Sequence, residues 1–329
     1  MVNIIQLFNS TKNKKDLITN LQNKGLIPAP NNYECPNCGN NLELCEYNAC
    51  PDGFAWRCRA MVSKNKQAAK KCETRLSIRT GTFFENSKMD ISQTLVFVHC
   101  WARGYKLIDA IHESEISKQT AVDWSSFCRE VLLADFIDNF EPLGGEGRTV
   151  EIDESKFGKR KYWRGHRVEG VWVFGALERE TGRVFMQPVE KRDAQTLIPL
   201  LEKWVLPKTT VISDCWKAYS NLQNFYHLKV NHSINFVDES TGAHTNSIER
   251  SWRHAKESFS SHGRKKEHVP GNLARYMFQK SCRMNEADPT EAFLKIAGRV
   301  YNPTTKTAHD YRDADGQLDR EDIEFFDEN

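Results

Sequence analysis

The chain of 329 residues is long enough for two or three domains, and its 39% hydrophobic content, with 18 Phe and 8 Trp, suffices for packed cores. The net charge of +2 is unevenly spread: residues 310–329 hold nine acids and two bases, so this tail carries −7 and the rest +9. A basic body with an acidic tail favours a polyanionic partner. The first residues lack a signal-peptide core, and the apolar run "LVFVHCWA" is too short to cross a bilayer, so we expect an intracellular protein without a membrane partner.

The first 30 residues are expected to form a helical lead-in. The stretch "KKDLITNLQNKG" places Leu17 and Leu21 at helical spacing, and Gly25 stands where the helix would stop. Pro28 and Pro30 then interrupt the chain before the first cysteines.

Six of the ten cysteines lie between positions 35 and 72. In a reducing compartment such cysteines are reduced or metal-bound rather than disulfide-bonded. The stretch "YECPNCGNN" is a Cys-x-x-Cys knuckle in which Gly39 permits the tight turn. Zinc needs two more ligands, and strand-like residues flank both Cys58 and Cys72. Cys45 and Cys50 form the rival second pair, and free thiols are the alternative to any metal.

We therefore predict a zinc ribbon over residues 31–87. It would hold one structural zinc ion through four thiolates, those of Cys35, Cys38, Cys58 and Cys72. The last two cysteines are fourteen positions apart, wider than an ordinary knuckle, so the lysine-rich insert "SKNKQAAKK" would have to loop out.

Residues 88–142 carry three helical patterns. Ile91, Leu95 and Val98 recur on one face, "GYKLIDAIHESE" follows as a short helix, and Ser117 caps "KQTAVDWSSFCREVLL". A short turn before the last helix suits a helix-turn-helix, although any small three-helix bundle shows the same pattern. The position directly after a zinc module favours a DNA-binding helix-turn-helix domain.

From Thr149 the pattern changes to alternating strands and helices. The expected elements are the strands "TVEIDES", "VEGVWVFGALE" and "GRVFMQPV", the turn "ERETG", the helix "DAQTLIPLLEKWV", the strand "KTTVISD", a helix starting at "CWKAYSNL", the strand "HLKVNH", and then helices to about residue 300. This order predicts an α/β domain over residues 143–300 with a mixed five-stranded sheet and an antiparallel hairpin at one edge. Residues 301–329 are expected to form an acidic, flexible tail.

Three acids are expected to converge in this domain. Asp153 lies in the first strand, Asp214 ends the fourth, and Glu249 lies on the helix of "HTNSIERSWRHAK". In this order the first and fourth strands can be central neighbours, and a side chain at the carboxyl end of a strand opens into the crevice of an α/β sheet. The alternatives are structural: a strand-end Asp214 that caps the next helix, and an N-cap at Asn246 that forms a capping box with Glu249.

Three carboxylates in one crevice repel one another unless cations neutralise them. Such hard oxygen ligands suit Mg²⁺ or Mn²⁺, and two ions about 4 Å apart are the arrangement that serves phosphodiester chemistry. We therefore predict Asp153, Asp214 and Glu249 as catalytic ligands of two divalent cations, with Lys256 two helical turns beyond Glu249 to contact DNA phosphate.

Basic residues flank the predicted crevice. The stretch "KFGKRKYWRGHR" interleaves cations with Tyr162 and Trp163, a composition suited to phosphate contacts and base stacking, and "HGRKKEH" adds a second patch. A solvated basic loop is the alternative. The predicted DNA-binding residues are Lys156, Lys159, Arg160, Lys161, Arg164, Arg167, Arg253 and Lys256.

The sequence resembles transposases of the Merlin superfamily, eukaryotic relatives of a group of bacterial insertion-sequence transposases. The resemblance extends from about residue 20 to 285, and its residues are "LQNKGLIPAPNNYECPNCG", "RLSIRTGTFFENSKM", "VEIDESKFGKRKYWRGHRVEGVWVFG", "ISDCWKAY" and "HTNSIERSWRHAK". It implies a zinc ribbon, a helix-turn-helix and an RNase H-like core whose Asp-Asp-Glu triad binds two divalent metals. By motif match, Asp153, Asp214 and Glu249 take those roles, Lys256 is the basic residue of the same helix, and His244 and Asn246 belong to the same motif.

The resemblance implies DNA cleavage at transposon ends and transfer of the freed 3′-hydroxyl into target DNA, by a homo-oligomer that brings two ends together. It also implies a nuclear location in a eukaryotic host, and otherwise a cytoplasmic one. Two alternatives remain open: a transposase-derived host protein that only binds DNA, and an RNase H-like nuclease without strand transfer. The intact triad favours the transposase over the first of these.

Overall fold

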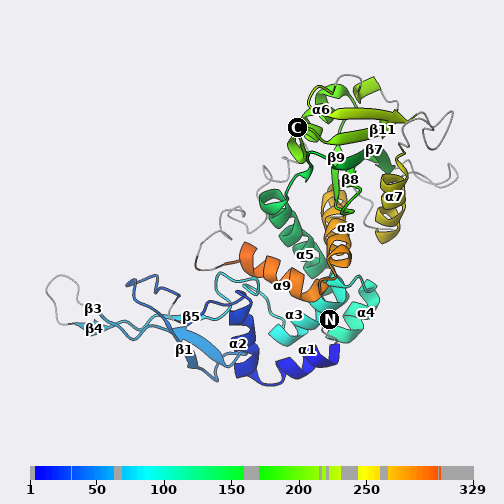
Figure 1. Ribbon diagram of the computed structural model, residues 1–329. Coiled ribbons are helices and arrows are strands. Elements are labelled where there is room, and N and C mark those ends of the chain that lie inside the picture. The colour runs from blue at the N-terminus through cyan, green and yellow to red at the C-terminus, as the bar shows by residue number, and fades with distance from the viewer. Residues whose placement is uncertain are drawn as a thin grey trace. The chain divides into compact units, whose positions relative to one another are not determined.

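The computed structural model describes residues 4–30, 32–62, 69–158, 170–214, 217–219, 222–230, 244–259, 266–302 and 304. The chain divides into two compact units, coloured along the chain in Figure 1. The first comprises the described residues of Met1–Ala134 and Ala287–Leu318, and the second those of Asp135–Glu286. Within the described part of the chain, no helix combines the length and apolar character needed to cross a bilayer.

The first unit begins with two short helices and a small sheet. Asn13 caps the second helix by accepting a hydrogen bond from Lys15 N at 3.0 Å, and Leu17, Ile18 and Leu21 are its buried residues. The predicted lead-in is therefore helical. The elements up to residue 77 are α1 (Ile4–Thr11), α2 (Lys14–Asn23), a sheet in the order β1 (Glu43–Glu46), β2 (Phe54–Arg57), β5 (Arg75–Ser77), and a separate ladder of β3 (Met61–Val62) with β4 (Lys70–Lys71).

Three helices follow, as the sequence predicts. They are α3 (Ile91–Ala102), α4 (Leu107–Ser114) and α5 (Lys118–Asn139). Asp90 and Gln93 form a capping box at the start of α3. Glu115 adopts the left-handed conformation, with φ of 54°, and so ends α4 sharply and leaves a short turn before α5.

The helix α9 (Pro289–Val300) belongs to the first unit, although the sequence placed it in the domain of residues 143–300. The reason is an aromatic cluster around Phe83. The Phe293 ring of α9 lies 5.9 Å from the ring of Phe83 and 5.4 Å from that of Trp101, between centroids. Arg103 also donates to Asp288, the N-cap of α9, at 2.6 Å. The periodicity of α9 predicted a buried face, but not which residues would cover it.

The second unit contains a five-stranded mixed sheet, as expected, in the order β12-β11-β7-β8-β9. The central strand β7 pairs in parallel with β11 and antiparallel with β8, and β8 and β9 form the antiparallel hairpin. The strands are β7 (Thr149–Phe157), β8 (Val171–Glu178), β9 (Val184–Val189), β11 (Thr210–Asp214) and β12 (Tyr226–Val230), with a short parallel pair of β6 (Leu143–Gly144) and β10 (Val205–Leu206).

Helices cover both faces of this sheet. On one face, α6 (Ala194–Trp204) packs against a cluster that includes Ile152, Phe174 and Phe185. On the other, α7 (Asn246–Ser258) and α8 (Val269–Met284) pack against Phe157, Val173 and Leu177. Successive strand residues point to opposite faces, so Asp153 lies on the α7 face and its neighbours Ile152 and Glu154 on the α6 face.

One predicted element differs from expectation. The segment "CWKAYSNL" was expected to start a helix, but its described residues form a single 3-10 turn, Lys217–Tyr219. Tyr219 and Ala218 of this turn are buried in the α6-side cluster. The turn therefore presents the Tyr219 side chain to the sheet, and the residues on either side of it, 215–216 and 220–221, lie outside the described part of the chain.

Candidate functional site

The two predicted catalytic aspartates lie at the same level of adjacent strands. The parallel pairing of β7 with β11 matches Thr149 with Thr210 and Glu151 with Ile212. Extended by two residues, this register places Asp153 beside Asp214, the last residue of β11. Side chains at matched positions of parallel strands point to the same face, so both carboxylates face α7.

The predicted third acid, Glu249, lies in the first turn of α7, which contacts β7 (Figure 1). Its side chain is exposed, and its Oε1 accepts a hydrogen bond from the Thr245 hydroxyl at 3.3 Å. Thr245, not Asn246, is the N-cap, so the structural alternative of an N-cap at Asn246 is wrong. Asn246 is instead the first residue of the helix and is exposed.

The electrostatics of Asp153 link the three acids. Burial raises the pKa of Asp153 to about 6, the hydrogen bond from Trp252 opposes this, and the charges of Asp214 and Glu249 add to it. Trp252 Nε1 donates to Oδ2 of Asp153 at 2.9 Å. Among the described residues, however, the only ligand group whose atoms all lie within 4.8 Å of one another is a set of cysteines, so the three carboxylates converge less tightly than that.

This donor set suits a hard divalent cation. Carboxylates on two neighbouring strands and on the helix that contacts β7 could supply oxygen ligands of the kind such a cation prefers. Burial raises the pKa of Asp153 most, and the charges of Asp214 and Glu249 raise it further; a bound cation would offset both costs of ionising the carboxyl.

Replacing Gly175 with Ala should lower the free energy of unfolding by about 1–3 kcal/mol. Gly175 pairs with Asp153 across the strands, and a Cβ built on it would lie 2.4 Å from Cη2 of Trp252. Urea unfolding measures the loss. Phe lacks the ring atoms that would clash. In the double variant with Trp252→Phe, the loss of unfolding free energy should therefore be smaller than the sum of the losses in the two single variants. Strict additivity would show that the Trp252 ring does not cause the loss.

A fourth acid was missed by the sequence analysis. Burial raises the pKa of Glu154 to about 7, and the hydroxyl of Tyr219 donates a hydrogen bond to its Oε1. The charges of Asp153 and Asp214 raise this pKa further, so Glu154 is coupled electrostatically to the two aspartates although it lies on the opposite face of the sheet. The adjacent acids in "EIDES" were the available signal. A strand pattern, however, does not show which of them will accept a hydrogen bond from a tyrosine hydroxyl.

Metal-free protein should become less stable as the pH rises from about 4 to about 7. In the unfolded chain Asp153 and Glu154 ionise near 3.8 and 4.5, whereas folding raises their pKa values to about 6 and about 7. The folded state therefore binds these protons more tightly, and the stability they confer is lost as they dissociate. For Asp153 alone the loss is on the order of 3 kcal/mol.

Urea unfolding across this pH range, in magnesium-free buffer, measures the effect. The same curve for Asp153→Asn removes one of the two groups, so the difference between the curves reports Asp153 together with its effect on the pKa of Glu154. The variant's curve should be flatter, and parallel curves would contradict the raised pKa of Asp153.

The predicted basic residues of α7 line an open hollow of about 530 Å³. Lys256 Nζ donates to Ser155 Oγ at 2.6 Å and lies 5.3 Å from the centre of the Phe157 ring. Arg253 is exposed and pairs with Glu257 at 3.0 Å. Glu249 and Lys256 both open onto this hollow, whose lining is Glu249, Trp252, Arg253, Lys256, Glu257 and Phe259.

The other predicted DNA contacts are mostly outside the described residues. Lys156 is described, and its Nζ lies 5.5 Å from the centre of the Trp172 ring. Most of "HGRKKEH" is not described, and its end forms the 3-10 turn Lys266–His268. Also outside the described residues are Lys159, Arg160, Lys161, Arg164 and Arg167.

The first unit brings four cysteine thiols together. The sulfur atoms of Cys35 and Cys72 are 3.8 Å apart, those of Cys38 and Cys58 are 3.5 Å apart, and all four lie within 4.8 Å of one another. A zinc tetrahedron with metal–sulfur bonds of about 2.3 Å has sulfur–sulfur edges of about 3.8 Å, so these thiols fit zinc. The hydroxyl of Thr74, 3.2 Å from Cys72 Sγ, lowers the pKa of that thiol and so favours the thiolate that zinc needs.

The backbone explains how the wide gap between the last two cysteines is closed. The ladder of β3 with β4 folds the intervening chain back on itself, with Met61 opposite Lys71. Cys58 N then donates to Thr74 O at 2.9 Å, and Cys72 N to Ala60 O at 2.7 Å. The first knuckle closes through Gly39, whose φ of +73° is the left-handed turn the sequence predicts.

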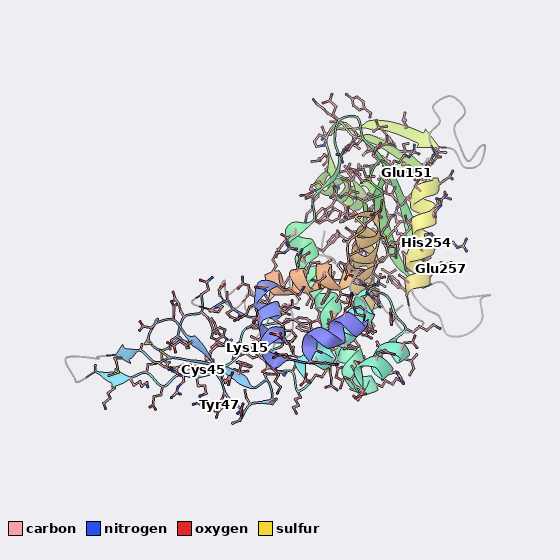
Figure 2. All side chains as sticks on the ribbon, turned by 60° about the horizontal axis from the view of Figure 1, so that its bottom comes forward. Lys15, Cys45, Tyr47, Glu151, His254 and Glu257 are labelled. Carbon is pink, nitrogen blue, oxygen red and sulfur yellow. The ribbon has the colours of Figure 1, made fainter. Side chains whose placement is uncertain are left out.

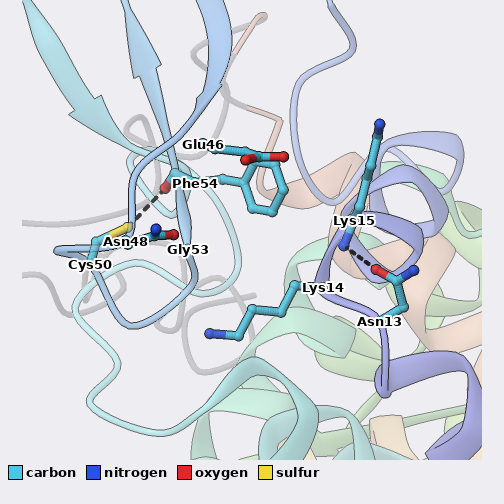
Figure 3. A pocket seen from close by; sticks show the side chains of 8 residues that line it. All are labelled: Asn13, Lys14, Lys15, Glu46, Asn48, Cys50, Gly53 and Phe54. Atoms are coloured by element: carbon cyan, nitrogen blue, oxygen red, sulfur yellow. Dashed lines mark hydrogen bonds between the residues drawn. The ribbon is translucent and has the colours of Figure 1, made fainter.

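The rival cysteines lie outside this quartet. Cys45 Sγ accepts a hydrogen bond from Arg59 Nη2 at 3.5 Å. The thiol of Cys50 donates to the carbonyl oxygen of Phe54 at 3.0 Å, in a hollow of about 360 Å³ between the ribbon and the start of α2 (Figure 3). Lys14 also lines this hollow, and its Nζ donates to Pro51 O at 2.8 Å. This hydrogen bond connects α2 to the turn between β1 and β2.

Comparison with known sequences associates the second unit with transposases. Residues 142–281 match the family described as the ISXO2-like transposase domain. The chain is 29% identical over 111 residues to an uncharacterised transposase-like protein of Haemophilus influenzae, covering 32% of this chain and 84% of that protein. It is 26% identical over 134 residues to male abnormal protein mab-31 of Caenorhabditis elegans, covering 35% of this chain and 31% of that protein. These matches support a transposase-family relationship, and the cysteine quartet lies outside the region that matches the domain.

Proposed function

We propose that this protein, whose residues 142–281 match an ISXO2-like transposase domain, is a DNA transposase of the Merlin superfamily with an RNase H-like catalytic core. The observation that supports the proposal is the parallel register of β7 with β11, which, extended by two residues, matches Asp153 with Asp214, and the contact of β7 with the helix that bears Glu249. In a chain that matches a transposase family, such a group of acids is suited to bind the divalent cations that catalyse phosphodiester cleavage and joining.

In the proposed reaction, Asp153, Asp214 and Glu249 would hold two Mg²⁺ or Mn²⁺ ions. When bound, such ions supply activation of the attacking oxygen and charge stabilisation of the leaving oxygen. Trp252 holds Oδ2 of Asp153 by a hydrogen bond, which orients the carboxylate. Lys256, held beside Ser155, positions a DNA phosphate in the hollow along α7. Hydrolysis breaks one P–O bond at the transposon end and frees its 3′-hydroxyl. Attack of that hydroxyl on a target phosphodiester forms a new P–O bond, breaks one in the target strand and releases a target 3′-hydroxyl.

The first unit supplies DNA binding in this proposal. The thiolates of Cys35, Cys38, Cys58 and Cys72 hold a structural zinc ion that shapes the ribbon, and α4 with α5 acts as the helix-turn-helix. The exposed basic side chains of the second unit contact the DNA backbone. A homo-oligomer that pairs two transposon ends, in the nucleus of a eukaryotic host, completes the proposal.

The test is a reaction of the purified full-length protein with labelled DNA that carries the inverted repeats flanking its genomic copy. Magnesium-dependent joining of labelled ends to a target plasmid supports a transposase. Cleavage without joining supports a nuclease, and binding without cleavage supports a DNA-binding protein that has lost catalysis. Absence of all three would remove DNA as the substrate.

The second candidate function, a host DNA-binding protein derived from a transposase, is favoured by the similarity to mab-31. The presence of all three acids argues for the enzyme, because a chain that only binds DNA has no chemical need for them. The reaction above separates the two, since only the enzyme changes the covalent structure of the DNA.

A further inference from the structure

The carboxylate of Glu151, on the α7 face of the sheet, is completely buried, with 0% of its side chain exposed. It precedes Asp153 by two residues on β7, so both side chains point to the same face. In Figure 2, Glu151 lies on the sheet beside one end of α7, while His254 and Glu257 mark the other end. Nothing in the sequence pattern separates Glu151 from an ordinary strand residue.

Both carboxylate oxygens of Glu151 are engaged at the start of α7. Oε2 accepts hydrogen bonds from the backbone N–H groups of Ser247 and Ile248, each at 2.9 Å. Oε1 accepts from Arg179 Nε at 2.6 Å. A carboxylate at a helix N-terminus is stabilised by the exposed amides and by the helix dipole.

Arg179 extends the same connection to the residue before the helix. Its Nη2 donates to the carbonyl oxygen of His244 at 2.6 Å, and its own N–H donates to Thr149 O of β7 at 2.9 Å. The ring Nδ1 of His244 lies 3.5 Å from Oε1 of Glu151. One ion pair thus attaches the chain on both sides of the N-cap to the central strand.

The helix depends on this attachment because its own cap does not replace it. Thr245 occupies the N-cap position without a side-chain hydrogen bond to the first helical amides. A buried carboxylate of a strand therefore satisfies amides that a capping side chain normally satisfies. Burying that charge is tolerated only because it is paired and fully hydrogen-bonded.

In the sequence of α7, Glu249 lies between two sets of hydrogen bonds that connect the helix to β7. The first joins Ser247 and Ile248 to Glu151, and the second joins Trp252 to Asp153. We propose that Glu151, oriented by Arg179, is a positioning residue that sets the place of Glu249 relative to Asp153 and so governs the affinity of the site for divalent cations. This inference rests on the proposed function through the assignment of Glu249 as a metal ligand.

The test compares Glu151→Gln with Glu178→Gln in the full-length protein. Glu178 is a matched control, because it is also 0% exposed, accepts from a backbone amide (Gly144 N, 2.6 Å) and pairs with an arginine (Arg148, 2.9 Å). The hydrogen-bond partners of its carboxylate are Gly144, Arg148 and Thr181, and none of these residues belongs to α7. Mn²⁺ affinity is measured by titration calorimetry, and amide hydrogen exchange is measured at Ser247 and Ile248.

In Glu151→Gln we expect the Mn²⁺ dissociation constant to rise about 10–100-fold, the range typical of residues that orient metal ligands. Exchange at Ser247 and Ile248 should accelerate by about tenfold, as expected for loss of a charge-assisted hydrogen bond. Glu178→Gln should change neither quantity, although its melting temperature falls. In the DNA reaction, Glu151→Gln should raise the Mn²⁺ concentration for half-maximal rate and leave the KM for DNA unchanged.

Arg179→Lys is the second variant, and it keeps the inference testable if Glu151→Gln does not fold. It retains the positive charge but loses the bond to His244 O, so the same shifts should appear at smaller size. A folded variant of either residue with wild-type Mn²⁺ affinity overturns the inference, as does an equal loss of affinity in Glu178→Gln. If the wild type binds Mn²⁺ and the variants weaken binding, but no DNA is cleaved, the positioning role stands and the transposase proposal fails. If the wild type binds no Mn²⁺ at this site, both fail.

Discussion

Replacing Asp153 with Asn should reduce magnesium-dependent cleavage and joining by on the order of 10³-fold, while binding to transposon ends persists. Asp153 is the acid that combines the strand register with Asp214 and the contact to α7 through Trp252. The substitution keeps the shape of the side chain but removes the negative charge that a cation requires. Rates are measured with labelled ends, and binding is measured by gel shift.

The variant should not lose activity through unfolding. Burial raises the pKa of Asp153 to about 6, so its charged form destabilises the metal-free fold at neutral pH, and the neutral amide relieves that cost. Asp193→Asn is the matched control, because Asp193 caps α6 in the same unit and Asn is an equally good N-cap. It should retain full activity. Joining that survives in Asp153→Asn would exclude this residue from the active site.

Replacing Cys58 with Ser should abolish zinc binding by the proposed four-thiol site and unfold the part of the chain around it. The Cys58 thiol is fully buried, with 0% exposure, and lies 3.5 Å from that of Cys38. Structural zinc in small domains contributes about 10–16 kcal/mol of binding free energy. A domain of this size has too small a hydrophobic core to stay folded without such a contribution. Zinc content is measured by elemental analysis, and unfolding by proteolysis within residues 31–87. DNA-end binding should fall with the zinc content.

Cys45→Ser is the control for this experiment. Cys45 lies in the same small sheet, in β1, but its sulfur contacts Arg59 and is not part of the quartet. This variant should retain one zinc ion per chain. Full zinc retention in Cys58→Ser, or zinc loss in Cys45→Ser, would show that the four assigned thiols are not the zinc ligands.

Much of the second unit could be predicted from the sequence because its signals are local. The alternation of apolar residues around Asp153 and in "GRVFMQPV" predicts strands, and the spacing of Ile248 and Trp252 predicts the buried face of α7. The order of strands and helices was enough to expect a mixed five-stranded sheet with an antiparallel hairpin, and that sheet is observed. The 3-10 turn at Lys217–Tyr219 escaped prediction because its conformation depends on burial of Tyr219 against the sheet.

The cysteines show the same division. The Cys-x-x-Cys spacing of Cys35 and Cys38 identifies a knuckle, because two ligands so close in the chain require one tight turn. The choice of Cys58 with Cys72 over Cys45 with Cys50 was a preference from flanking residues, and the spacing alone left both open. The ladder of β3 with β4 decided it, by bringing the far ends of a fourteen-residue separation together.

The sequence by itself predicted the types and order of most elements of the second unit, the Cys-x-x-Cys knuckle, and three of the acids near α7. Only the tertiary structure decided that Glu151 and not Asn246 serves the start of α7, that Glu154 meets Tyr219, and that α9 joins the first unit. The physical reason is that periodicity and turn chemistry act between near neighbours in the chain. A buried charge, by contrast, is stable only with the hydrogen-bond partners that folding brings from distant segments.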